Sequence, residues 1–163
     1  SIPAVGGAAS WGGELEVTAR VHEGVDVFSA LGFTRARFSD GSAAGGLSVA
    51  GNTIPYAPDY TATIGTQLSR EVRAGVSIYG RAEAVFHGAF HYDEANTVTQ
   101  EGYSLANLRG GVRGRILFAE AWVRNAFDTF YVPVALPLAF TPSGFVGEPG
   151  SPRTFGVTVG VGF

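Results

Sequence analysis

The residues best suited to bind a ligand lie in one short polar stretch, HGAFHYDEAN, at 87–96. It brings together imidazole, phenol and carboxylate groups on His87, His91, Tyr92, Asp93 and Glu94. Imidazole and carboxylate are ligands for metal ions and metal chelates. The spacing matches no standard metal site, however, and a solvated polar loop explains the same composition. We therefore predict no metal site and treat the five residues as candidate ligand contacts.

Other site chemistry finds little support in the sequence. The chain has no cysteine, which excludes disulfides, thiolate–metal sites and cysteine nucleophiles. Nothing resembles Gly-x-Ser-x-Gly, and no helix follows the glycine-rich stretch 39–46, so it is not a phosphate cradle. The net charge of −3 gives no basic stripe for nucleic acid. We predict a non-enzymatic protein with no cofactor and no nucleic-acid partner.

The elements that carry these residues alternate as β-strands do. The end of the chain places its apolar residues on one face: Phe155, Val157, Val159, Val161 and Phe163. Such period-two alternation indicates a strand with two unlike faces. The pattern predicts seven strands, at 14–22, 25–38, 60–68, 76–87, 103–113, 117–124 and 155–163. The strand at 103–113 keeps its phase only with a bulge near Leu105.

The connections between these strands alternate between short and long. Short turns are expected at 23–24, 69–73 and 113–115, and long loops at 39–59, 88–102 and 126–152. Outer-membrane barrels sort their connections in this way, with tight periplasmic turns and long extracellular loops. A soluble sandwich has no reason to do so. Helical periodicity is not sustained anywhere, and no apolar run is long enough for a transmembrane helix.

The two faces of the strands also favour a membrane barrel. One face carries charged residues such as Glu14, Arg81 and Arg109, whereas the other carries small apolar residues. Aromatic residues fall near strand ends, where interfacial girdles lie, at Trp11, Phe33, Tyr60, Phe86, Tyr103, Phe127, Phe130, Tyr131 and Phe155. The predicted fold is all-β, an antiparallel transmembrane β-barrel wall of seven to eight meander strands. A soluble all-β binding module is the competing interpretation.

Four motifs resemble a known family. GNTIPYAPDYTATIG (51–65) resembles the loop-to-strand signature of TonB-dependent receptors, and YSLANLRGGVR (103–113) resembles one of their tyrosine-led strands. VRNAFDTFY (123–131) is similar to their Asn-Leu-Phe-Asp-x-x-Tyr motif, with Ala126 in place of leucine. GSPRTFGVTVGVGF (150–163) is similar to their terminus. From the residues themselves, Asn125 and Asp128 are expected to shape the chain's exit from its strand through hydrogen bonds to the backbone.

The resemblance implies a bacterial outer-membrane protein for TonB-dependent uptake of a scarce nutrient: a ferric siderophore, cobalamin or a glycan. It implies outer-membrane lipid and the barrel-assembly machinery as partners, with Phe155, Val157, Val159, Val161 and Phe163 as the assembly signal. TonB would act only through a plug domain, which these residues do not contain.

The number of strands bears on how much of a barrel is present. Such receptors have twenty-two strands, and seven strands would leave open edges. We therefore expect 1–163 to be one barrel segment, the C-terminal part of a larger receptor. The alternative is a complete eight-stranded barrel with a structural or adhesive role, if residues 1–10 or part of 132–140 add a strand.

Overall fold

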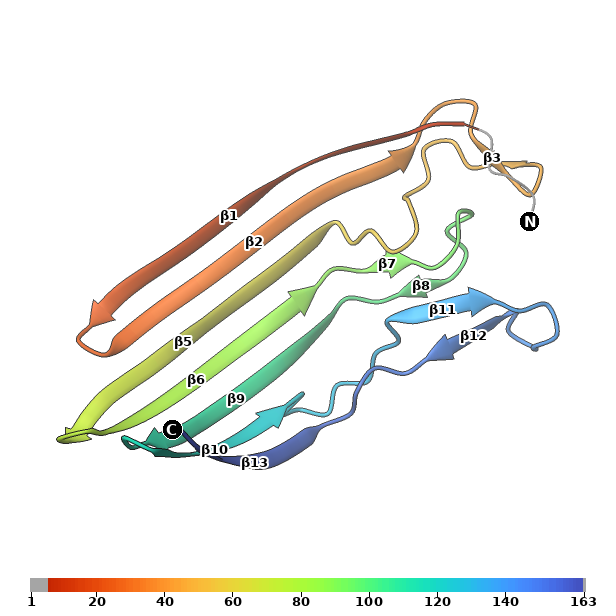
Figure 1. Ribbon diagram of the computed structural model, residues 1–163. Helices are drawn as coiled ribbons and strands as arrows, with labels where there is room; N and C mark the ends of the chain where they lie inside the picture. The colour runs from red at the N-terminus through yellow and green to blue at the C-terminus, as the bar shows by residue number, and fades with distance from the viewer. Residues whose placement is uncertain (1–5, 163) are drawn as a thin grey trace.

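The main feature of the computed structural model, which describes residues 6–162, is an antiparallel meander of seven strands in chain order (Figure 1). Its strands are β1 (Ala8–His22), β2 (Val25–Phe38), β5 (Tyr60–Arg73), β6 (Val76–His87), β9 (Tyr103–Arg113), β10 (Leu117–Arg124) and β13 (Thr154–Val161). This confirms the predicted all-β meander. Residues 6–162 contain no helix that could cross a membrane.

Short turns and long loops lie at opposite ends of this sheet, which we call the turn end and the loop end (Figure 1). Each long loop contains a small two-stranded hairpin. The hairpins are β3 (Ala43–Ala44) with β4 (Leu47–Ser48), β7 (Phe90–His91) with β8 (Thr99–Gln100), and β11 (Val134–Pro137) with β12 (Phe145–Glu148). β11 pairs with β12 outside the seven-stranded sheet, so 132–140 adds no eighth strand to it.

Three local expectations about the strands were wrong. β1 begins at Ala8 rather than at 14, because Gly12 and Gly13 conceal the alternation of its first half. The turn expected at 69–73 lies at 74–75, where Gly75 has a φ of +76°, a value that glycine adopts without strain. β9 needs no bulge: its register with β6 is continuous, and Leu105 pairs with Val85 on the same face as the charged residues.

Register assigns the side chains of the sheet to two faces. The polar face carries most of the charged residues, among them Glu14, Arg81 and Arg109. The apolar face carries the alternate residues, with arginines near the strand ends at positions 35, 37 and 70. On β13 the apolar face is strongly exposed: Val157 and Val159 have exposed fractions of 73% and 69%. A row of exposed valines on a continuous sheet indicates a surface that needs an apolar solvent.

The aromatic residues of the apolar face record the tilt of the strands. The register relates positions on neighbouring strands across the six strand boundaries between β1 and β13. Relative to the position level with Trp11 of β1, Phe155 of β13 lies eight residues closer to the turn end. Phe33, Tyr60 and Phe86 lie on this line. With about 3.3 Å per residue and about 4.8 Å per strand, the tilt is about 42°. Membrane barrels have tilts of about 35–45°.

This line corrects part of the predicted girdle. Tyr103 belongs to the polar face, where its ring is stacked between those of His87 and Tyr131 at centroid distances of 4.8 and 4.6 Å. Phe127 and Phe130 follow β10 and are 82% and 77% exposed beyond the line. The aromatic girdle of the described residues is therefore the diagonal from Trp11 to Phe155.

The sheet of residues 6–162 has two free edges, since β1 pairs only with β2 and β13 pairs only with β10. Buried packing is correspondingly sparse and lies mainly between the long loops. Phe90, Tyr92 and Ala135 form its centre, and the hydroxyl of Tyr56 donates to the carbonyl of Ala135 at 2.5 Å. These contacts join all three long loops into one body.

Candidate functional site

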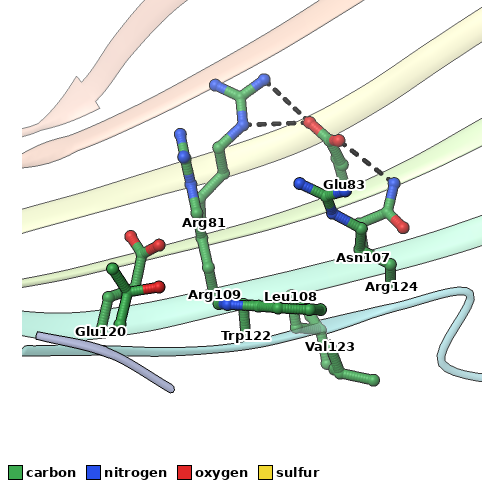
Figure 2. A pocket seen from close by; sticks show the side chains of 10 residues that line it. Arg81, Glu83, Asn107, Leu108, Arg109, Glu120, Trp122, Val123 and Arg124 are labelled. Carbon is green, nitrogen blue, oxygen red and sulfur yellow. Dashed lines mark hydrogen bonds and ion pairs between the residues drawn. The ribbon is translucent and has the colours of Figure 1, made fainter. Parts of the chain in front are cut away.

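The polar face has a hollow lined by charged side chains from β6, β9 and β10 (Figure 2). Arg81 donates two hydrogen bonds to Oε2 of Glu83, from Nε at 3.0 Å and from Nη2 at 2.9 Å. Arg109 and Arg124 line the same hollow, and neither forms an ion pair with any other residue of 6–162. One arginine is thus neutralised, and two retain their donors.

Large rings of the polar face lie over glycines of the next strand. The four ring–glycine pairs are Phe28–Gly65, Tyr79–Gly111, Trp122–Gly156 and Phe118–Gly160. A Cβ added at Gly156 would come within 2.6 Å of the Trp122 ring. The glycine therefore lets each ring lie flat across its neighbour strand, and Tyr79 reaches far enough to donate a hydrogen bond to Glu120 on β10 at 3.0 Å.

Three of these rings are in cation–π contact with an arginine. The guanidinium carbon of Arg81 lies 4.0 Å from the centroid of Phe28, on the far side of β5. Arg113 lies 5.6 Å from Tyr79, and Arg124 lies 5.3 Å from Trp122. Cation–π contact holds a guanidinium near a ring without consuming its hydrogen-bond donors. Glycine, ring and arginine thus form layers that fix the positions of the positive charges.

The ring–glycine layer is open to a direct test with Gly156→Val. The added side chain must displace the Trp122 ring, so we expect a loss of about 1–3 kcal/mol in the free energy of unfolding. Denaturant titration in lipid vesicles of a closed barrel containing these residues measures it. Gly13→Val is the matched control, because nothing lies within 4 Å of a Cβ at Gly13. Equal losses in both variants contradict the layer.

A line of hydrogen bonds joins the hollow to the base of the third long loop. Nδ2 of Asn107 donates to Oε1 of Glu83 at 3.3 Å, and Oδ1 of Asn107 accepts from the backbone N–H of Asn125 at 3.1 Å. The amide of Asn107 therefore contacts the arginine–carboxylate pair on one side and the chain's exit from β10 on the other.

Asn125 and Asp128 shape that exit, as the sequence predicted. The buried Asn125 side chain donates to the carbonyls of Thr129 and Ser151 and accepts from the N–H of Thr129. Oδ1 of Asp128 accepts from the N–H of Arg153 at 2.7 Å. Asn125 and Asp128 have positive φ values of 48° and 55°. Asparagine and aspartate tolerate this region better than most residues.

We expect Asn125→Ala to destabilise the base of this loop. The change leaves partly buried backbone groups of Thr129 and Ser151 without these hydrogen bonds, which costs about 1 kcal/mol, and it places alanine at positive φ. Hydrogen exchange at residues 126–131 and 150–153 should accelerate accordingly. Asn125→Gly removes the same hydrogen bonds but adopts positive φ without strain. If its amides exchange as slowly as in wild type, the hydrogen bonds are not what protects the loop.

The five candidate ligand residues lie at the loop end, and most of them make contacts within the protein. His87 is stacked on Tyr103, and Nδ1 of His91 lies 2.9 Å from the hydroxyl of Thr99. The buried hydroxyl of Tyr92 lies 2.6 Å from the carbonyl of Val132. Glu94 is exposed, and its backbone carbonyl accepts a hydrogen bond from the side chain of Asn52. Residues 6–162 contain no cluster of metal-ligating side chains.

Asp93 closes a turn inside the loop 88–102. Its carboxylate accepts hydrogen bonds from the N–H groups of Thr97 and Val98, at 2.9 and 3.0 Å, and from the Thr97 hydroxyl at 2.7 Å. Burial by itself raises the pKa of Asp93, but these hydrogen bonds outweigh it and hold the pKa below its ordinary value. Burial also raises the pKa of Tyr92, so its hydroxyl stays a donor at neutral pH.

The lowered pKa of Asp93 predicts that acid opens this turn. A carboxylate with a depressed folded-state pKa stabilises above its unfolded pKa, near 4, and this stabilisation is lost as pH falls through the folded value. Exchange of the Thr97 and Val98 amides should accelerate in that window. In Asp93→Asn, exchange should be fast at every pH. Protection that persists in this variant shows that the carboxylate is dispensable.

The layers of the polar face were not predicted from the sequence. The signal was present as glycines at 156 and 160, opposite aromatic residues at 122 and 118. Without register, however, no pairing of a ring with a particular glycine follows. The arginines of the face were recognised as inward charges, but not as a cluster.

The fold and the polar face together define a segment of an outer-membrane barrel wall. The family model described as TonB dependent receptor-like, beta-barrel matches residues 1–126. The chain therefore belongs to the TonB-dependent receptor family, whose members are transporters rather than enzymes. The match includes the first fifty residues, in which the sequence alone offered no motif.

Known proteins show how much of a receptor this chain represents. The catecholate siderophore receptor Fiu of Escherichia coli K12 is 29% identical over 113 residues, which cover 69% of this chain and 14% of that protein. The structure of the ferric yersiniabactin uptake receptor FyuA from Yersinia pestis has a TM-score of 0.82 at 23% identity, covering 96% of this chain and 24% of that one. The closed form of the E. coli K12 ferric-catecholate import receptor Fiu has a TM-score of 0.71 at 26% identity, covering 96% and 21%.

Proposed function

We propose that these residues form part of the wall and outer loops of a longer receptor that takes up a scarce nutrient with energy from TonB. The observation that carries the proposal is the family match over 1–126. Among the possible nutrients we favour a ferric siderophore over cobalamin or a glycan. The support is that similar proteins are named as catecholate siderophore and ferric yersiniabactin receptors.

The orientation follows from the sorting of the connections. Long loops of outer-membrane barrels are extracellular and short turns are periplasmic, so the loop end faces the medium and the polar face lines the lumen. The described residues supply wall and loops. TonB would act through a plug domain supplied by the rest of the receptor.

Ligand contact is proposed for the loop 88–102, and its candidates divide into two groups. Tyr92 and Asp93 use their polar groups to build the loop. Glu94 is exposed and retains its carboxylate for a ligand, and His91 retains Nε2. Glu94→Ala should therefore weaken ligand binding without disturbing the fold, with the exposed Glu101→Ala as the matched control.

Assembly is proposed to depend on the apolar face of β13. Phe155, Val157, Val159 and Val161 lie along it, and the barrel-assembly machinery would bind this strand together with Phe163, which lies outside the described residues. Outer-membrane lipid would then cover the same side chains in the finished barrel.

Uptake of labelled iron tests the function. Cells deleted for the gene, complemented with the receptor and grown without free iron, are given a radiolabelled ferric catecholate with and without functional TonB. We expect accumulation only when receptor and TonB are both present. Accumulation of cobalamin or an oligosaccharide instead changes the substrate class. Accumulation that ignores TonB rejects the proposal.

A further inference from the structure

The hollow on the polar face holds more positive charge than its own carboxylates neutralise. Arg81, Arg109 and Arg124 line it together with Glu83 and Glu120 (Figure 2). Glu83 is bound to Arg81 through two hydrogen bonds. Glu120 accepts from Tyr79 and forms no ion pair within 6–162. Arg109 and Arg124 therefore keep their donor groups free of protein acceptors in the described part of the chain.

These two arginines are close neighbours by register. Arg109 on β9 lies opposite Trp122 on β10, and Arg124 is the next residue of β10 on the same face. Diagonal neighbours of this kind have Cα atoms about 7–8 Å apart, within reach of long side chains. Both guanidinium groups can therefore approach one small group placed between them.

Packing holds Arg124 in place. Arg124 lies over the Trp122 ring, which in turn lies over Gly156. Thr158 lines the hollow and adds a hydroxyl donor. A side chain whose position is fixed by packing loses less conformational entropy when it binds. Arg124 is thus held in position before any ligand arrives.

We propose that Arg109 and Arg124 form an oxyanion-binding site on the inner wall, which takes a carboxylate or a phosphate-type group. Planar guanidinium groups present paired N–H donors that match the two oxygens of such an anion. The hollow holds three arginines and two carboxylates, so it keeps a net positive charge that an anion can neutralise. The proposal rests on the proposed receptor function only in placing the polar face inside a closed barrel.

The anion has two possible sources, a diffusible anion or a side-chain carboxylate from another part of the receptor. The test uses the purified full-length receptor in detergent, and it measures the midpoint of thermal unfolding. Sodium phosphate is titrated against sodium chloride at matched ionic strength, without TonB and without a nutrient. A separate series lowers the pH from 7 to 4.

A diffusible anion predicts a saturable rise of the midpoint with phosphate. In the double variant Arg109→Gln/Arg124→Gln, the half-saturating phosphate concentration should rise tenfold or more. A carboxylate of the receptor itself predicts no phosphate response, but a midpoint that falls with acid in wild type and falls less in the double variant. The sign follows because a carboxylate paired with arginine has a lowered pKa and loses its stabilising charge on acidification.

Two further variants make the result decisive. Arg115→Gln removes one charge at the β9–β10 turn, outside the hollow, and should leave both responses as in wild type. Arg109→Lys/Arg124→Lys keeps the charge but loses the paired donors, and it replaces the glutamine pair if that pair does not fold. If the double variant matches Arg115→Gln in both series, the site does not exist. Because no transport is measured, failure of the proposed uptake function leaves this result unaffected.

Discussion

Val159→Arg should cost about 2–4 kcal/mol of folding free energy, the range for an arginine turned to lipid near the midplane. Val159 lies in the middle of β13 on the apolar face, opposite Ala119, and it is 69% exposed. Hydrocarbon must cover this position in a barrel, and a guanidinium there loses its hydration. Folding titrations in lipid vesicles measure the cost.

The matched control is the adjacent residue. Thr158 faces the hollow opposite Glu120, so the arginine of Thr158→Arg meets water and a carboxylate and should cost much less. Ala82→Arg on the apolar face and Ser77→Arg on the polar face repeat the comparison on β6. Similar penalties on both faces would overturn the assignment of lipid and lumen.

Residues 1–163 expressed alone should not form a heat-resistant monomeric barrel. β1 and β13 each leave one side of the strand without a partner in the described sheet. Each unpaired backbone group in hydrocarbon costs several kcal/mol, and this cost recurs along both edges. We expect aggregation or edge-to-edge oligomers.

Electrophoresis with and without boiling, after refolding in detergent, distinguishes the outcomes. The same residues inside a full-length receptor are the control and should migrate as a compact, heat-modifiable species. A compact monomer from the isolated segment indicates that the sheet closes by itself. That result favours the complete small barrel with a structural or adhesive role.

Period-two alternation was enough to predict the seven strands and their two faces, apart from the first half of β1 and the phase of β9. Each strand separates a membrane from an aqueous interior, so every second side chain reports its solvent directly. The long loops at 39–59 and 88–102 agree with the structure residue for residue, because polar, glycine- and proline-rich stretches are unlike the strands beside them. The roles of Asn125 and Asp128 were also predictable, since short polar side chains bond locally to the backbone.

Tertiary structure alone decided which residues of different strands meet. Strands alternate with the same period whatever their register, so sequence pattern cannot place Phe28 over Gly65 or Arg109 beside Arg124. The strand tilt, and with it the girdle from Trp11 to Phe155, likewise depends on pairing along six strand boundaries. The long loops pack through contacts such as Tyr56 with Ala135, which are distant in sequence. The sequence therefore determined what each strand faces, whereas register determined the site.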